Sequence, residues 1–335
     1  MMKLRNQFSK KSIKNLIQII KWVILFVFLF IVWHYFQWDQ FSNILTNLSI
    51  KAIFLYVLVI FISRILYAFR WKLIASVVIK NIQIKLGYFL QTNFLAEFVT
   101  IVMPTSLGGE VARVLKLNYR GSRTTLSAAS ILIDRALGIA GMLAVSLISL
   151  VLIGKKISFN LAEIIPEILH LPLIVLLTLI AASILVVGFF WLRNPSQKGR
   201  LARAWVLVRG NIPLLSFAFL VSILAHLVFS LAHYFLLEEL FPLSIPEIIA
   251  VILTPQLARS IPISVLGISA GEGLMVSGQM MIGMPKETAL VITLVALASR
   301  YFFALLGFLI EFVRDGIRFF TKVKTPEDDM TDSTL

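Results

Sequence analysis

The sequence predicts an all-α polytopic membrane protein with about six transmembrane helices and two re-entrant helical hairpins, arranged as an inverted repeat. Of its 335 residues, 59% are hydrophobic and 14% are charged, whereas about 25% of the residues of a soluble domain are charged. The apolar residues also form blocks of about 20, enough to cross a hydrocarbon core roughly 30 Å thick. Finally, Gly and Pro interrupt two further apolar segments near their middles.

Six uninterrupted apolar blocks predict the transmembrane helices. They comprise residues 16–36, 50–69, 126–153, 171–192, 212–236 and 288–310. The basic stretch 1–15 before the first block resembles the start of a signal peptide, but the block is too long and no small-residue cleavage site follows it. We therefore expect a retained first helix. Residues 325–335 are polar and acidic, and we expect them to form a disordered tail.

The charges between the blocks predict the orientation in the membrane. Most Lys and Arg residues fall before the first block, on both sides of the segment 81–116, and after the fourth and sixth blocks. Because positive loops stay inside the cell, this pattern places both termini in the cytoplasm and the protein in the cytoplasmic membrane. Topology thus accounts for most of the net charge of +14, and we expect no nucleic-acid partner.

The two interrupted segments predict re-entrant hairpins. Segment 81–116 begins and ends among cytoplasmic charges, and segment 245–284 begins and ends on the opposite side. The halves 16–157 and 158–324 then carry the same order of helix, helix, hairpin and helix with opposite orientation. Interrupted segments at corresponding positions of an inverted repeat are a sequence indication of a transport site.

The two interruptions share a motif, in which Pro is followed by Leu-Gly and then by Gly-Glu. The predicted hairpin breaks are Pro104, Gly108 and Gly109 in the first segment and Pro262, Gly267 and Gly271 in the second. Pro ends a helix, and Gly permits a turn or close approach of a ligand. The half-helix that follows exposes N–H groups that can hold a phosphate or a carboxylate. The alternative is a kink whose glycines only ease helix packing.

Ionisable residues inside apolar segments are costly and need a partner or a polar cavity. Each hairpin carries a Gly-Glu pair, Glu110 or Glu272, and each following helix carries an Arg, Arg135 or Arg300. These residues either form ion pairs that fix each hairpin to its helix or bind an anionic headgroup. If they bind a headgroup, the candidate headgroup-binding residues are Arg64, Arg113, Arg135, Arg259 and Arg300. The candidate counter-ions or proton carriers are Glu110, Asp134 and Glu272.

Neighbouring positions on a helix point about 100° apart, so Asp134 and Arg135 are expected to have different partners. The run Arg70-Trp71-Lys72 is typical of an interfacial anchor without a further role. Cysteine is absent and the four histidines are scattered, so we expect no metal site. We interpret His226 and His233 as helix-packing residues. No nucleophile–base pair or nucleotide motif is present, so we expect no catalytic residues and no cofactor.

The motifs together resemble a known family. Arg64…Arg70-Trp71, Pro104-x-x-Leu107-Gly108-Gly109-Glu110-x-x-Arg113, Asp134-Arg135 and Pro262…Gly267…Gly271-Glu272 are similar to the transmembrane domain of lysylphosphatidylglycerol synthase/flippases, over roughly residues 15–320. The resemblance implies movement of aminoacylated phosphatidylglycerol between leaflets. In two-domain family members a soluble domain makes this lipid. This chain ends soon after its last helix, so we expect no synthase activity and a separately encoded lipid-modifying enzyme.

The leading hypothesis is a flippase-like translocase for an anionic or aminoacylated phospholipid, or for a lipid-linked intermediate, driven by an ion or lipid gradient. One alternative is an intramembrane enzyme acting on a lipid or polyprenyl-phosphate substrate. Another is a non-transporting scaffold for cell-envelope enzymes. Membrane lipids are the expected partners, and the sequence is compatible with a homodimer.

Overall fold

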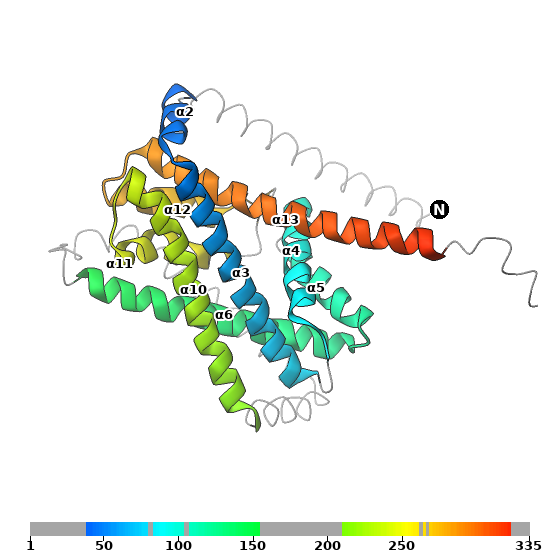
Figure 1. The fold of residues 1–335 in the computed structure, drawn as a ribbon. Coiled ribbons are helices and arrows are strands. Elements are labelled where there is room, and N and C mark those ends of the chain that lie inside the picture. Colours follow the sequence, from blue (N-terminus) through cyan, green and yellow to red (C-terminus); the bar gives the residue numbers. More distant parts are fainter. Residues whose placement is uncertain are drawn as a thin grey trace, which may run out of the picture. The chain divides into compact units, whose positions relative to one another are not determined.

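The computed structural model describes residues 38–79, 83–103, 107–154, 210–260, 264–265 and 268–322 (Figure 1). The chain divides into two units, Met1–Asn47 and Leu48–Leu335. The first contains helix α2 (Trp38–Asn47), and everything below concerns the second. Several predictions fall outside the described residues: the spans 16–36 and 171–192, the breaks Pro104, Pro262 and Gly267, and the terminal segments 1–15 and 325–335.

Four described helices are long and apolar enough to cross a membrane, which confirms four predicted spans. They are α3 (Ile50–Val78), α6 (Thr124–Gly154), α10 (Ile212–Leu240) and α13 (Lys286–Lys322). Each is longer than its apolar block, because backbone hydrogen bonding continues beyond the apolar residues. Large apolar side chains remain exposed on these helices, including Leu132, Leu220 and Phe302, as is expected of surfaces that face lipid.

Helices α3 and α10 pack antiparallel against one another. Near one end, the N–H of Ser49 donates to Glu239 Oε2 at 2.9 Å. Toward the other, Arg70 Nη1 donates to Ser222 Oγ at 2.8 Å. Small residues on the two helices are fully buried: Ala68, Ala75, Ala218, Ala225 and Ala232. Small side chains allow close approach of helices in a membrane.

The first interrupted segment folds as two packed helices, α4 (Leu86–Val102) and α5 (Leu107–Tyr119). Gly109 brings them together: a Cβ there would lie 2.6 Å from the carbonyl oxygen of Ala96 and would also overlap Thr100 Oγ1. A side chain at this position would therefore push α5 away from α4. The predicted hairpin thus has two helical arms, and its return to the cytoplasmic side stays a prediction.

The second interrupted segment is less regular than predicted. Its first arm comprises α11 (Ile245–Ile248), the π-helical η3 (Ile249–Leu253) and the 3₁₀-helical η4 (Thr254–Ser260). Strands β1 (Ser264–Val265) and β2 (Ile268–Ser269) pair antiparallel before α12 (Ala270–Met281). The first arm is therefore helical but mostly not α-helical, and Pro255 supplies a physical reason because it lacks the N–H that an α-helix requires.

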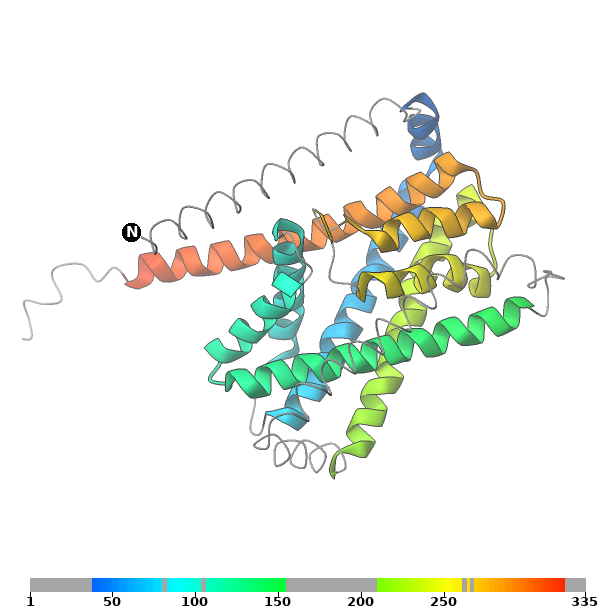
Figure 2. The same cartoon turned by 180° about the vertical axis from the view of Figure 1, so that it is seen from behind.

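Each long helix that follows an interrupted segment packs on the interrupted segment of the other half, as Figure 2 allows the reader to trace. Helix α13 lies on α4, where the Phe94 and Phe303 rings stack at 5.2 Å. Helix α6 lies against α11 and η3, where Ser149 donates to the carbonyl oxygen of Pro246. In each half, the helix after the interrupted segment thus packs on the interrupted segment of the other half. Their inversion across the membrane stays a prediction.

Candidate functional site

Two cavities open among the helices of the second unit, with volumes of about 290 and 240 Å³. Both are lined by Arg64, Tyr67, Arg70, Glu97, Arg113 and Asp134. The larger cavity also contacts Arg135, His226, Gln256 and Arg259, and the smaller also contacts Asn93, Thr100, Glu110 and Arg300. Charged side chains thus form much of both walls.

The first charge cluster consists of Arg70, Glu110, Arg113, Asp134 and Arg135, from helices α3, α5 and α6. Asp134 is its centre: Arg70 Nε lies 2.8 Å from Oδ1 and Arg113 Nη2 lies 2.8 Å from Oδ2. The Asp134 side chain is buried. Arg113 also stacks its guanidinium 3.9 Å from the centre of the Trp71 ring. This carboxylate therefore joins three helices through two arginines.

Arg135 completes the first charge cluster through a different acid. Its Nε donates to Glu110 Oε1 at 2.9 Å, while Glu110 Oε2 lies 3.7 Å from Arg113 Nη1. Asp134 and Arg135 thus have different partners, as the helical spacing predicts. The hairpin Glu thus pairs with the Arg of the following helix, which is one of the two alternatives that the sequence left open.

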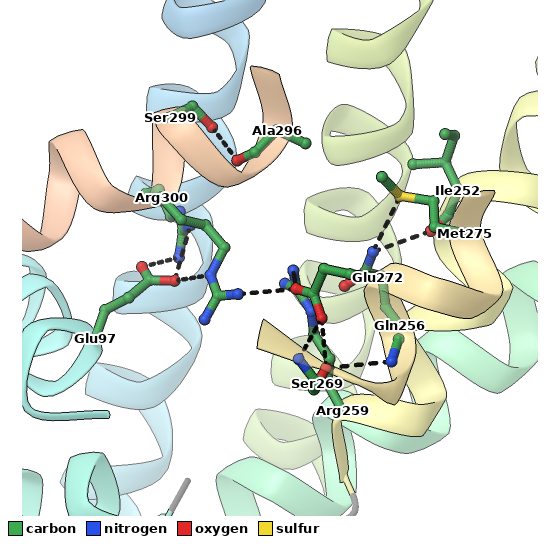
Figure 3. A network of polar contacts seen from close by, with 12 residues as sticks. Glu97, Ile252, Gln256, Arg259, Ser269, Glu272, Met275, Ala296, Ser299 and Arg300 are labelled. Carbon is green, nitrogen blue, oxygen red and sulfur yellow. Dashed lines mark hydrogen bonds and ion pairs between the residues drawn. The ribbon is translucent and has the colours of Figure 1, made fainter. Parts of the chain in front are cut away.

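The second charge cluster consists of Arg64, Glu97, Arg259, Glu272 and Arg300, and Figure 3 shows most of it. Arg300 lies between two carboxylates, donating from Nε to Glu97 Oε1 at 2.9 Å and from Nη1 to Glu272 Oε1 at 3.0 Å. Arg64 Nη1 lies 2.6 Å from Glu97 Oε2, and Arg259 pairs with Glu272. Arg300 thereby connects α4 with α12, one element from each interrupted segment. Glu272 and Arg300 also form an ion pair, as in the first of the two alternatives for these residues.

Glu272 also caps the N-terminus of α12 through hydrogen bonds with Ser269. Its Oε2 accepts hydrogen bonds from the N–H and the hydroxyl of Ser269 at 2.7 and 2.6 Å. The Ser269 hydroxyl oxygen in turn accepts from the N–H of Gly271 at 3.2 Å. These donors are satisfied within the chain, as in a capping box. The N–H groups of Ser269 and Gly271 are thus occupied within the chain, and phosphate binding at this helix end stays a prediction.

Arg70 and Trp71 correct another expectation, because neither is an interfacial anchor. Arg70 is 7% exposed and Trp71 is fully buried. Helix α3 continues to Val78, so both residues lie well inside it rather than at its end. Arg70 joins the site through Asp134 instead.

Glu97 is the most central residue that the sequence reasoning left without a role. It contacts both cavities and bridges Arg64 and Arg300. The sequence could have indicated this role, because Glu97 is the one charged residue of the helix Leu86–Val102. An acid in such a helix requires a partner or a polar cavity, and Glu97 has both.

Tyr67 and His226 form a neutral polar patch on the wall of the larger cavity. His226 Nε2 lies 3.0 Å from the carbonyl oxygen of Gly138, and Nδ1 lies 3.0 Å from the Tyr67 hydroxyl. Because a carbonyl oxygen only accepts, we assign the proton to Nε2, so that Nδ1 accepts from Tyr67. Among the described residues no group of three or more His, Cys, Asp or Glu side chains is arranged to hold a metal.

The structure brings most of the predicted site residues together. The cavity walls include Arg64, Gly109, Glu110, Arg113, Asp134, Arg135, Arg259 and Arg300. Glu272 takes part through its two arginines. Gly108 and Gly271 lie in the first turns of α5 and α12; a Cβ on Gly271 would lie 3.1 Å from the carbonyl oxygen of Pro255.

Residues 18–307 match the family described as the lysylphosphatidylglycerol synthase TM region. The chain belongs to this family. The match covers all the described residues that line the two cavities. Together with the four long apolar helices, it identifies a multi-pass membrane protein whose family is linked to lipid function. A comparison with curated proteins gives no match.

Proposed function

We propose that this family member is a lipid translocase of the cytoplasmic membrane. The headgroup of an anionic lipid enters the two cavities while its acyl chains stay in the bilayer. One observation carries the proposal: ionised side chains from α3, α4, α5, α6, η4 and α13 meet at the same cavity walls. Charges within apolar helices mark the paths of polar substrates through membranes.

The composition of the two charge clusters favours an anion as cargo. They contain six arginines, namely Arg64, Arg70, Arg113, Arg135, Arg259 and Arg300, but four carboxylates. A guanidinium group binds phosphate through planar, paired hydrogen bonds. Because the arginines outnumber the carboxylates, guanidinium groups of the clusters can bind a lipid phosphate.

The position of Arg300 supports movement rather than simple binding. Its pairs with Glu97 and Glu272 connect the first interrupted segment to the second. A phosphate that bonds to Arg300 competes with these carboxylates and weakens the connection. In transporters with two repeats, rocking of one repeat against the other exposes the site to each side in turn.

A lipid-flip assay in reconstituted vesicles tests the proposal. The purified chain should accelerate the movement of a fluorescent anionic phospholipid between leaflets. Glu97→Gln should slow this movement about tenfold, because it removes a charged partner from two arginines of the site. Glu110→Gln, Arg135→Ala and Glu272→Gln should also slow it.

Glu311→Gln is the matched control. The Glu311 side chain is 14% exposed, compared with 13% for Glu97, and it also pairs with two cations, Lys116 and Arg314. It lines neither cavity. Equal slowing by both changes, or no acceleration by the unmodified chain, contradicts the proposal. Chemical conversion of the lipid without its movement supports an intramembrane enzyme instead.

A further inference from the structure

We infer that the headgroup held at these cavities carries a dianionic terminal phosphate, as in a phosphate-monoester lipid, rather than a phosphodiester or an aminoacylated headgroup. The inference rests on the proposed function and names its substrate class. The observation behind it is the charge balance of the two clusters.

Each cluster has the same imbalance among the described residues. The first has three arginines for the two acids Glu110 and Asp134. The second has three arginines for the two acids Glu97 and Glu272. Each cluster thus carries one formal positive charge in excess. Six guanidinium groups and four carboxylates leave a site with two cationic charges to balance.

The two excess charges face a common space. The larger cavity is lined by Arg70, Arg113 and Arg135 of the first charge cluster and by Arg64 and Arg259 of the second. Like charges near one another in a poorly solvated space repel strongly. One dianion placed between the clusters balances both. A singly charged phosphodiester leaves one cationic charge unbalanced.

An aminoacylated headgroup fits this balance less well, because its ammonium group adds a cation to a site that already has an excess. The acids that could receive the ammonium each have an arginine partner, although Oε2 of Glu97 and of Glu110 accepts no hydrogen bond in the described part of the chain. Glu97 pairs with Arg64 and Arg300, and Glu110 accepts from Arg135. An ammonium group bound at either acid would therefore lie beside arginines whose positive charge is already in excess.

The hydrogen-bond inventory of the arginines agrees with an acceptor-rich ligand. The Nε–H groups of Arg113 and Arg259 are buried and donate to no acceptor in the described part of the chain, and both side chains line the larger cavity. A terminal phosphate offers three strong acceptor oxygens. Rotation of either guanidinium toward the cavity would bring such a donor to the ligand.

Equilibrium binding to the purified full chain in detergent tests the inference. Phosphatidic acid, phosphatidylglycerol and lysylphosphatidylglycerol with identical acyl chains are compared. Phosphatidic acid should bind about tenfold more tightly than phosphatidylglycerol, a difference typical of one additional charged contact. Lysylphosphatidylglycerol should bind most weakly. Inorganic phosphate should compete poorly; if it matches phosphatidic acid, the ligand is a soluble phosphate and the inference fails.

Two charge-removing variants sharpen this test. Arg135→Gln removes one excess charge and should reduce the preference for phosphatidic acid over phosphatidylglycerol to near unity. Arg314→Gln removes the same charge from a side chain that lines neither cavity, and it should leave the preference unchanged. Because the readout is a ratio of two affinities, a loss of folded protein does not imitate the effect.

The failures of the two proposals are distinguishable. Equal or tighter binding of phosphatidylglycerol or lysylphosphatidylglycerol by the unmodified chain overturns the substrate class, even if lipid still moves between leaflets. If vesicles show no lipid movement but the preference and its loss in Arg135→Gln are observed, the binding site stands and the translocase function fails. A change in preference with Arg314→Gln equal to that with Arg135→Gln also overturns the inference.

Discussion

Asp134 illustrates how single residues stabilise this protein. Its carboxylate receives Arg70 from α3 and Arg113 from α5 while it lies on α6. In a buried pair, the attraction must offset the cost of removing both ions from water. Removal of the shared anion would leave Arg70 with no acid partner among the described residues and Arg113 with only its longer contact to Glu110.

We therefore expect Asp134→Asn to lower the free energy of unfolding by about 3–5 kcal/mol, the usual cost of breaking a buried ion pair. Glu110→Gln should cost about 1 kcal/mol, because the Glu110 and Arg135 side chains are partly exposed. Their side chains are 23% and 33% exposed, compared with 5% for Asp134. Thermal and denaturant unfolding in detergent measures the free energy of unfolding of both variants. Equal decreases would show that burial does not determine the cost of breaking these ion pairs.

At the scale of the elements, the glycines of the interrupted segments set the register of each hairpin. Gly109 lies against the Ala96 carbonyl oxygen and Thr100, and Gly271 lies against the Pro255 carbonyl oxygen and Arg259. In both segments the glycine therefore meets a carbonyl and the side chain four residues later. By this register Thr100 corresponds to Arg259, so the two halves use equivalent positions for different chemistry.

Gly109→Ala should destabilise the protein by about 1–3 kcal/mol, as is usual for overpacked interiors. The added Cβ would approach the backbone of α4, which cannot turn aside as a flexible side chain can. Gly273→Ala in α12 is the control because a Cβ there has no neighbour within 4 Å. Alanine should stabilise that helix by up to about 1 kcal/mol. If unfolding midpoints move equally in both variants, the close approach at Gly109 has no energetic importance.

At the scale of the whole molecule, the inverted repeat makes a prediction about sidedness. The loop between α5 and α6 is expected in the cytoplasm, and the loop before α13 is expected outside. The chain contains no cysteine, so single cysteines can be introduced at the exposed positions Thr125 and Lys286 without background labelling.

An impermeant thiol reagent added to intact cells should label Lys286→Cys and spare Thr125→Cys. After permeabilisation both should react. Labelling of both positions from the outside, or of Thr125→Cys alone, contradicts the inverted arrangement of the two halves. The experiment is independent of lipid transport, so it tests the topology by itself.

The sequence alone determined the membrane class, four of the spans that the structure describes, both interrupted segments, and the need of the buried Glu and Arg residues for a partner or a polar cavity. These features depend on local properties: the length of an apolar block, the missing N–H of proline, and the high cost of a charge in an apolar helix.

Only the tertiary structure decided which charges meet. It placed Arg70 beside Asp134, gave Glu97 its two arginines, satisfied the N–H groups of Ser269 and Gly271 within the chain, and made the first arm of the second interrupted segment π- and 3₁₀-helical. Such features depend on partners far apart in sequence. The cost of a buried charge shows that a partner must exist, but only the packing of the helices determines which one is within reach.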